Sequence, residues 1–355
     1  MKKVPSYIRK KFVANKVYSF LLESKITELP IDIKELCFYH DWPLHPYTSV
    51  AKHQSRSLEF VRKKLRSKDG KAYKLGTDHY EIFYDNTKPS VRQRFTIMHE
   101  IGHIVLGHLD DFNGINNSLT KYEYKILEGE ANLFASLTLA PPSILQRLGF
   151  MSDAPLIRRF CNISSEASRY ASERTEAQIR ALFPSHMSQT LITLFHDYIH
   201  RKHCRVCKGA FISELEKPHC PYCGSKAIYW GRKSNMSKIY EGIEVDETSK
   251  ALVCPICENN ELQDGDFCPI CSISVVNQCG KMSLDTDFHG NSWPTPCPVS
   301  LKGNYRYCPQ CGGKSTFLIN GLLKTWKGEY YKKLEQAEAP PPFGSEVLPD
   351  EDIPF

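Results

Sequence analysis

The apolar positions in the first part of the chain recur at helical spacing. In residues 6–24 they alternate with lysines and arginines, which predicts an amphipathic helix. A second, short helix is expected in residues 29–39, with Asp32 in its first turn, where a carboxylate suits the helix dipole. A basic stretch over residues 52–74 leads into residues 79–85, whose composition predicts a strand that ends at a turn.

Further helical patterns make the first two hundred residues mainly helical. They cover residues 90–108, 122–139, 154–183 and 185–200. The third of them predicts two helices joined at 162–164, with Ser164 or Ser165 as the N-cap; the pair is similar to a helix-turn-helix, although a plain helical hairpin is favoured. After residue 200 the chain changes to short strands, turns and paired cysteines. The pattern therefore predicts an α+β protein: one mainly helical domain over residues 1–200, then small modules.

Length and composition limit the class of protein. A chain of 355 residues argues for two or three domains, and 41% hydrophobic with 24% charged residues is typical of a folded, soluble majority. No apolar run approaches the ~20 residues that a membrane span needs. The basic N-terminus lacks the apolar stretch of a secretory signal. We therefore expect a cytoplasmic protein with no membrane partner.

Charge is distributed unevenly along the chain. Residues 1–74 hold 17 Lys and Arg against 7 Asp and Glu, whereas the segment from residue 335 onward holds 6 acidic residues and no basic one. This asymmetry indicates a polyanionic partner, a basic partner for the tail, or masking of one segment by the other. For the N-terminal part alone, a solvated basic surface explains the charge equally well. Residues 335–355 are rich in proline and acidic residues, which predicts a disordered acidic tail.

The strongest chemical signal is the H-E-x-x-H motif. Residues four apart share one face of a helix, so His99 and His103 can bind one metal ion, and Glu100 beside them can accept a proton from a metal-bound water. Zinc then needs a third protein ligand. We favour Glu130, which lies 27 positions after His103. Glu128 would then lie about 200° away around the helix and could not share the role.

A chance motif on a surface helix is the alternative. It is disfavoured because the flanking residues are mostly apolar, and a buried helix with two His and a Glu needs partners for those groups. The donor set would also accept manganese or cobalt. Peptide hydrolysis at such a site needs a donor for the oxyanion, and the spacing leaves Tyr122, Tyr124 and His108 open.

Twelve of the 14 cysteines lie after residue 203, mostly as C-x-x-C pairs. Each pair directs two thiolates at one ion, and two pairs complete a tetrahedron, so the sites are structural zinc sites. The groups are Cys204, Cys207, Cys220 and Cys223 in a zinc ribbon over 201–235; Cys254, Cys257, Cys268 and Cys271 in a second ribbon over 250–275; and Cys279, Cys297, Cys308 and Cys311 in a third module over 276–330. The cysteines of the third module are irregularly spaced, and His289 could replace one of its ligands. We thus expect one catalytic and two or three structural Zn²⁺ ions.

Aromatic and basic residues alternate beside two of these modules. This pattern suits stacking on unpaired nucleic-acid bases, and it suits packing of a small module equally well. The residues are Tyr229, Trp230, Arg232 and Lys233, and Tyr305, Arg306 and Tyr307.

Three segments together carry a family resemblance. Residues 29–36 (LPIDIKEL), 92–103 (RQRFTIMHEIGH) and 128–142 (EGEANLFASLTLAPP) resemble the ImmA/IrrE family of zinc metallopeptidases, over about residues 10–185. The resemblance implies a gluzincin-like domain with His99, His103 and Glu130 as zinc ligands and Glu100 as general base. Members of the family cleave transcriptional repressors of phages, mobile elements or DNA-damage regulons. Here zinc modules stand where family members carry a sensory domain.

The last six residues, Asp350, Glu351, Asp352, Ile353, Pro354 and Phe355, resemble the acidic tip of bacterial single-stranded-DNA-binding proteins. That resemblance implies docking on DNA replication and repair proteins. A terminal Phe can fill an apolar pocket while its α-carboxylate and the preceding acids meet basic side chains. An ordinary acidic tail is the alternative.

These features together favour a zinc endopeptidase that cleaves a regulatory protein, such as a helix-turn-helix repressor. The ribbons and the tip would position it at DNA or at DNA-processing proteins. Two alternatives remain open: a non-catalytic zinc-ribbon scaffold that binds nucleic acid or host repair proteins, and a triggered, toxin-like defence protease. The intact Glu100 disfavours the scaffold, since a structural zinc site needs no base.

Overall fold

The computed structural model describes residues 4–112, 119–150, 153–179, 186–231, 238, 240–262, 265–286, 289–290 and 292–328. The acidic tail, with the D-I-P-F tip, lies outside the described residues. The chain divides into two compact units, Met1–Ile199 and His200–Phe355. The helix-and-strand composition with cysteine clusters confirms the α+β class.

The first unit begins with two short helices that the sequence pattern predicts. α1 spans Lys10–Glu23 and buries the apolar stripe Val13, Val17, Phe20 and Leu21. α2 spans Ile33–Tyr39. Asp32 precedes α2 as its N-cap, because its carboxylate accepts hydrogen bonds from the backbone N–H groups of Lys34 and Glu35. The sequence pattern places Asp32 inside the first turn, whereas in the structure the helix begins only at the next residue, Ile33.

A three-stranded sheet lies beside the long helices of this unit. β1 (Leu44–Pro46) pairs in parallel with β3 (Tyr80–Tyr84), and β2 (Gly70–Lys74) pairs antiparallel with the other side of β3. Two short helices, α3 (Tyr47–His53) and α4 (Leu58–Leu65), lie between β1 and β2 in the chain. The basic stretch 52–74 thus contains a helix and an edge strand that its charge pattern did not predict.

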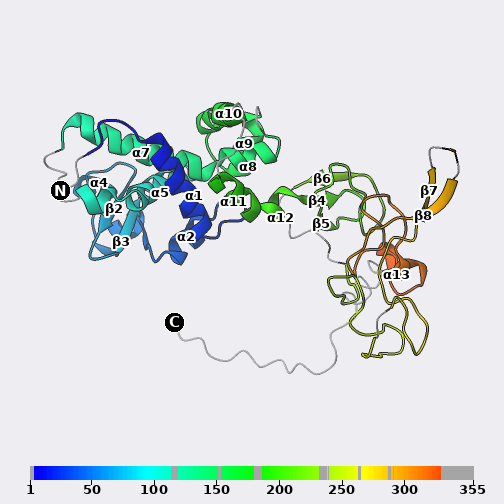
Figure 1. The fold of residues 1–355 in the computed structure, drawn as a ribbon. Coiled ribbons are helices and arrows are strands. Elements are labelled where there is room, and N and C mark those ends of the chain that lie inside the picture. Colours follow the sequence, from blue (N-terminus) through cyan, green and yellow to red (C-terminus); the bar gives the residue numbers. More distant parts are fainter. Residues whose placement is uncertain are drawn as a thin grey trace, which may run out of the picture. The chain divides into compact units, whose positions relative to one another are not determined.

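The centre of the unit is a helix pair. α5 (Ser90–Val105) packs against α7 (Lys121–Leu139) and also against β2 and β3 (Figure 1). α5 and α7 approach closely at Gly102, where an added Cβ would lie only 3.2 Å from the carbonyl oxygen of Ala131. α7 begins with a capping box between Thr120 and Glu123. The short α6 (His108–Phe112) follows α5.

Five shorter helices follow among the described residues of the first unit. They are α8 (Pro142–Arg147), α9 (Ala154–Cys161), α10 (Ser165–Ile179), α11 (His186–Leu194) and α12 (His196–Ile199). α9 and α10 pack together as the predicted pair, and the Ser164 hydroxyl accepts a hydrogen bond from the backbone N–H of Ala167 as the N-cap of α10.

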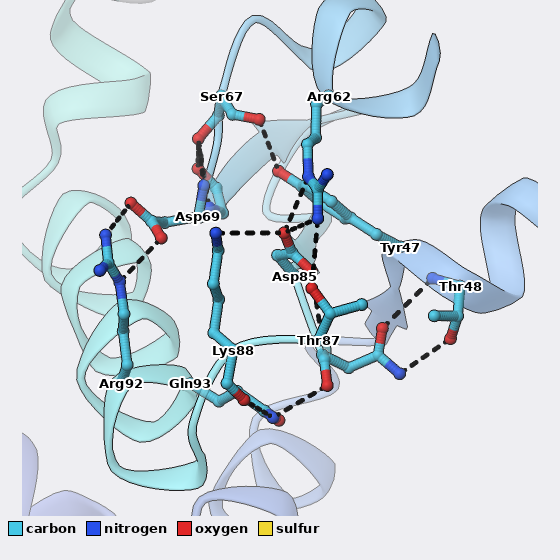
Figure 2. A network of polar contacts seen from close by, with 12 residues as sticks. Tyr47, Thr48, Arg62, Ser67, Asp69, Asp85, Thr87, Lys88, Arg92 and Gln93 are labelled. Atoms are coloured by element: carbon cyan, nitrogen blue, oxygen red, sulfur yellow. Dashed lines mark hydrogen bonds and ion pairs between the residues drawn. The ribbon is translucent and has the colours of Figure 1, made fainter. Parts of the chain in front are cut away.

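A buried ion pair fixes the loops before α5. Arg62 donates two hydrogen bonds, of 2.9 and 2.7 Å, to one carboxylate oxygen of Asp85, while Thr87 donates from its hydroxyl and its backbone N–H to the other (Figure 2). Burial alone would raise the pKa of Asp85, but the hydrogen bonds from Thr87 and Arg62 outweigh it and lower that pKa. Asp85 is therefore ionised and holds the end of β3 to α4.

A second ion pair ties β2 to α5. The guanidinium of Arg92 donates to both carboxylate oxygens of Asp69, at 2.9 and 2.8 Å, and the Ser67 hydroxyl oxygen accepts from the backbone N–H of Gly70 (Figure 2). These contacts hold the start of β2 beside the first turn of α5, the helix that carries the H-E-x-x-H motif.

The second unit is built around the cysteines. β4 (Arg201–Cys204) lies between β5 (Ala210–Ile212) and β6 (Ile228–Trp230); β7 (Met282–Thr286) and β8 (Ser292–Pro296) form a hairpin; α13 spans Thr316–Ile319. One apolar cluster joins cysteines 204, 207 and 220 with cysteines 279 and 308, and another joins the second ribbon with Phe317 and Leu323. The cysteine modules therefore share cores instead of packing separately.

Among the described residues, no helix has the length and apolar character that crossing a bilayer requires.

Candidate metal centre and cysteine clusters

A cleft of about 630 Å³ opens in the first unit along α5. It is lined by side chains of α5 and α7, by the start of β2 and by the loop before it. His99, Glu100, His103 and Glu128 all line this one cleft. A concave site of this size with convergent polar groups is where a ligand or substrate is expected to bind.

Three donor atoms converge in the cleft. The Nε2 atoms of His99 and His103 lie 3.1 Å apart, and Glu128 places one carboxylate oxygen 3.3 Å from the first and the other 3.4 Å from the second. The three side chains form a group that could hold a metal ion. The motif thus brings both histidines to one point, as its spacing predicts.

Glu130, the sequence-based choice for the third ligand, does not lie with the two histidines. It is fully buried, and its carboxylate accepts hydrogen bonds from Arg9 and contacts His108. The physical reason is the 200° rotation between residues two apart on α7, which allows only one of the two glutamates to face α5. Glu128 takes the position that Glu130 was expected to fill.

The outer nitrogen of His99 has a fixed partner. Its Nδ1 lies 2.9 Å from the side-chain oxygen of Asn132 on α7, so the ring donates there and directs the lone pair of Nε2 into the cleft. Burial lowers the pKa of His103 to about 4, so this imidazole is neutral at neutral pH. Two nitrogen lone pairs and one carboxylate facing a single point match the donor set that zinc takes in open sites.

Glu100 lies beside this donor set. It is buried, and its carboxylate accepts a hydrogen bond of 2.7 Å from the backbone N–H of Ala72 on β2. Burial raises the pKa of Glu100, and the hydrogen bond from the backbone N–H of Ala72 opposes that shift. A carboxylate whose proton affinity is raised, next to a metal site, has the property that a general base needs.

The three candidate oxyanion donors occupy different surroundings. Tyr124 lines the cleft, and its hydroxyl contacts Glu128; partial burial and that carboxylate raise its pKa to about 12. The hydroxyl of Tyr122 instead donates to the backbone oxygen of Ser6. His108 is buried between His103 and Glu130. Tyr124 is therefore the one whose hydroxyl lies beside the metal donors.

All twelve cysteines of the second unit fall into the three predicted groups of four. Neighbouring sulfurs within the first two groups lie 3.5 to 3.6 Å apart, and in the third group 3.4 and 4.0 Å. A tetrahedron with zinc–sulfur bonds of ~2.3 Å has sulfur–sulfur edges of about 3.8 Å. These spacings fit one ion per group and are far too long for disulfides. Four thiolates leave no open position, so the groups fit structural zinc.

The aromatic and basic residues of the second unit divide between surface and core. Tyr229 is 42% exposed and stacks on His203, with the guanidinium of Arg205 5.2 Å from its ring centre. By contrast, Tyr305 and Arg306 are buried, and Arg306 donates hydrogen bonds to backbone carbonyls of residues 241, 304 and 324. For this second group, packing is the role that the structure shows. Arg232 and Lys233 lie outside the described residues.

Comparison with known proteins gives a match inside the first unit. A family model described as the IrrE N-terminal-like domain of peptidase family M78 matches residues 54–172, a range that contains α5, α7 and the whole cleft donor set. A search of curated proteins found no match. Residues 54–172 are thus similar to the IrrE N-terminal-like domain of the M78 metallopeptidases.

Proposed function

We propose that the chain is a zinc-dependent endopeptidase whose catalytic metal is held by His99, His103 and Glu128. The observation that carries this proposal is the convergence of three donor atoms in one cleft, with the buried carboxylate of Glu100 beside them. Bound there, Zn²⁺ would lower the pKa of a water molecule toward ~7 and polarise the scissile carbonyl.

The chain's own residues supply the remaining chemistry. Glu100 accepts the proton of the attacking water and passes it to the leaving amine. The Tyr124 hydroxyl donates to the developing oxyanion. Gly70 and Ala72 of the edge strand β2 line the cleft, which suits a substrate bound as an extended segment along that strand.

The substrate that we propose is a regulatory protein, in particular a DNA-binding repressor of a phage, a mobile element or a stress regulon. The similarity of residues 54–172 to the ImmA/IrrE family supports this class. The exposed Tyr229 with Arg205, on a module with a predicted structural zinc, supports a position at nucleic acid. The D-I-P-F tip supports docking on DNA replication or repair proteins.

The metal proposal predicts a specific loss of zinc. We expect Glu128→Gln to bind one zinc ion fewer per chain than the wild type, because a neutral amide replaces an anionic ligand. Glu123→Gln is the matched control: it removes a carboxylate from the same helix, and Gln also satisfies a capping box. Zinc per chain is measured after dialysis against a weak chelator. Equal zinc content in Glu128→Gln and the wild type would refute this ligand assignment.

The docking proposal predicts separable effects of the tip. A chain that ends at residue 349 should lose capture of replication or repair proteins from a lysate, while its cleavage of short peptides is unchanged, because the cleft lies in the first unit. Mass spectrometry of captured proteins, with the full chain and with Phe355→Ala in parallel, provides the measurement. Identical capture by all three chains would remove the tip from the proposal.

A further inference from the structure

The segment that precedes α1 lies along α7. The Tyr122 hydroxyl donates a hydrogen bond of 3.0 Å to the backbone oxygen of Ser6. Two turns further along α7, Gly129 leaves room for Ile8, since an added Cβ would lie 2.5 Å from the Ile8 side chain. Residues 6–9, here called the N-terminal strap, are therefore seated on the helix that carries Glu128. The match to the M78 family begins only at residue 54.

Arg9 anchors the strap to a buried carboxylate. Its backbone N–H and its Nε atom donate to one oxygen of Glu130, at 2.8 and 2.9 Å, and its Nη2 atom donates to the other at 2.8 Å. Glu130 is 0% exposed. Both carboxylate oxygens are thus paired with the Arg9 guanidinium, and a carboxylate held in this way accepts hydrogen bonds from its neighbours.

Two histidines connect this carboxylate to the metal donors. The Nε2 atom of His108 lies 3.2 Å from Glu130 and donates to it. Its other ring nitrogen, Nδ1, lies 3.0 Å from the Nδ1 atom of His103. A His103 that binds a metal through Nε2, the atom that faces His99 and Glu128, carries its proton on Nδ1 and donates it to His108.

We propose that the N-terminal strap positions the catalytic metal ligand, with Arg9 and Glu130 fixing the ring orientation and tautomer of His103 through His108. The inference rests on the proposed metal centre. Carboxylate partners of metal-bound histidines raise affinity by this kind of orientation, and losing one costs 10–100-fold in metal affinity. Here the carboxylate acts through one additional histidine, and a segment outside the matched family region holds it in place.

The chain offers a matched control for the loss of Arg9. Arg62 and Asp85 form a second pair of a half-buried Arg with a fully buried carboxylate: the side-chain exposures are 33% and 0%, against 32% and 0% for Arg9 and Glu130. Figure 2 shows Arg62 in a network of loop contacts, and none of its hydrogen bonds reaches a metal donor. Arg62→Met thus removes a comparable ion pair without touching the path to His103.

The experiment measures zinc transfer from the full-length chain to the chromogenic chelator 4-(2-pyridylazo)resorcinol. Zinc leaves the different sites in separate phases. The phase that is present in the wild type and missing in His103→Ala reports zinc from the catalytic site. We expect Arg9→Met to weaken zinc binding in that phase by about 10–100-fold, while Arg62→Met keeps the wild-type affinity. Equal catalytic-site affinity in Arg9→Met and Arg62→Met would overturn the inference, because both variants lose a buried ion pair.

A second variant covers the case in which Arg9→Met does not fold. His108→Phe keeps the ion pair of Arg9 with Glu130 and removes only the link to His103. It should show the same 10–100-fold loss, and wild-type affinity in His108→Phe would overturn the inference. A different outcome would refute the proposed metal centre itself: His103→Ala would then transfer as much zinc as the wild type.

Discussion

Glu100→Gln should lower kcat/KM for peptide hydrolysis by about 10²–10⁴-fold, while the catalytic zinc stays bound. Glutamine keeps the size of the side chain and an oxygen that can accept the hydrogen bond from Ala72. It cannot take a proton from the attacking water, so the loss falls on the chemical step. The measurement combines cleavage rates on a library of short peptides with zinc per chain for both proteins.

The comparison with Glu128→Gln separates the two roles of the cleft carboxylates. Glu100→Gln should be inactive although its catalytic zinc is bound, whereas Glu128→Gln should be inactive because that zinc is lost. If Glu100→Gln cleaved peptides at the wild-type rate, Glu100 would not be the base. If it lost its zinc as Glu128→Gln does, Glu100 would be part of the ligand set instead.

Loss of one cysteine from the third module should unfold more than that module. Cys308 is fully buried and lies in the same apolar cluster as Cys204, Cys207 and Cys220 of the first ribbon. Structural zinc contributes an apparent binding free energy of about 10–16 kcal/mol to such small folds, because the unfolded chain has no preformed site. Cys308→Ala should therefore lose its own zinc and destabilise the first ribbon, which shares its core.

The control for this variant is Cys37→Ala. Cys37 is also buried but lies in α2, away from the predicted zinc groups, and burial raises the pKa of its thiol to about 12. Zinc per chain and limited proteolysis, with the cut sites mapped by mass spectrometry, provide the readouts. We expect cuts between residues 201 and 231 in Cys308→Ala and none in Cys37→Ala. Protection of the first ribbon in Cys308→Ala would show that the modules fold independently.

The sequence predicts the histidine pair on α5 well, because the relative position of the two rings depends only on the local helix geometry. The four-residue spacing of His99 and His103 places both rings on one face of any helix, whatever it packs against. Cysteine pairs are predictable for the same reason, since each C-x-x-C sets its own turn. The short helix α4 and the strand β2 were missed because lysines and arginines dominate residues 52–74, and β2 is recognisable only through its pairing with β3.

The choice between Glu128 and Glu130 depends on how α7 is rotated against α5, which is a tertiary property. One signal in the sequence does bear on it. Ile126 and Phe134 lie four residues on either side of Glu130, so Glu130 stands in the middle of the buried stripe of α7. A carboxylate in that stripe needs a partner, and Arg9 lies 121 residues away in the chain. No local pattern indicates a pairing at that distance.

Packing also decides the roles of the aromatic and basic residues near the cysteines. Tyr229 with Arg232 and Tyr305 with Arg306 look alike as sequence, because both place a ring near a cation. Arg306 is 0% exposed, since the shared core of the cysteine modules closes over it and backbone carbonyls accept its hydrogen bonds. Only the first group keeps a ring at the surface for a partner.

The most direct test of the peptidase proposal is a proteome-wide search for new protein N-termini in cells that express the chain. Wild type is compared with Glu100→Gln, with and without DNA damage, at equal protein levels. We predict one or a few N-termini that are present with the wild type and absent with Glu100→Gln, among them a cut in a regulatory DNA-binding protein. Identical sets of N-termini under both conditions would contradict the proposal that this cleft cleaves proteins.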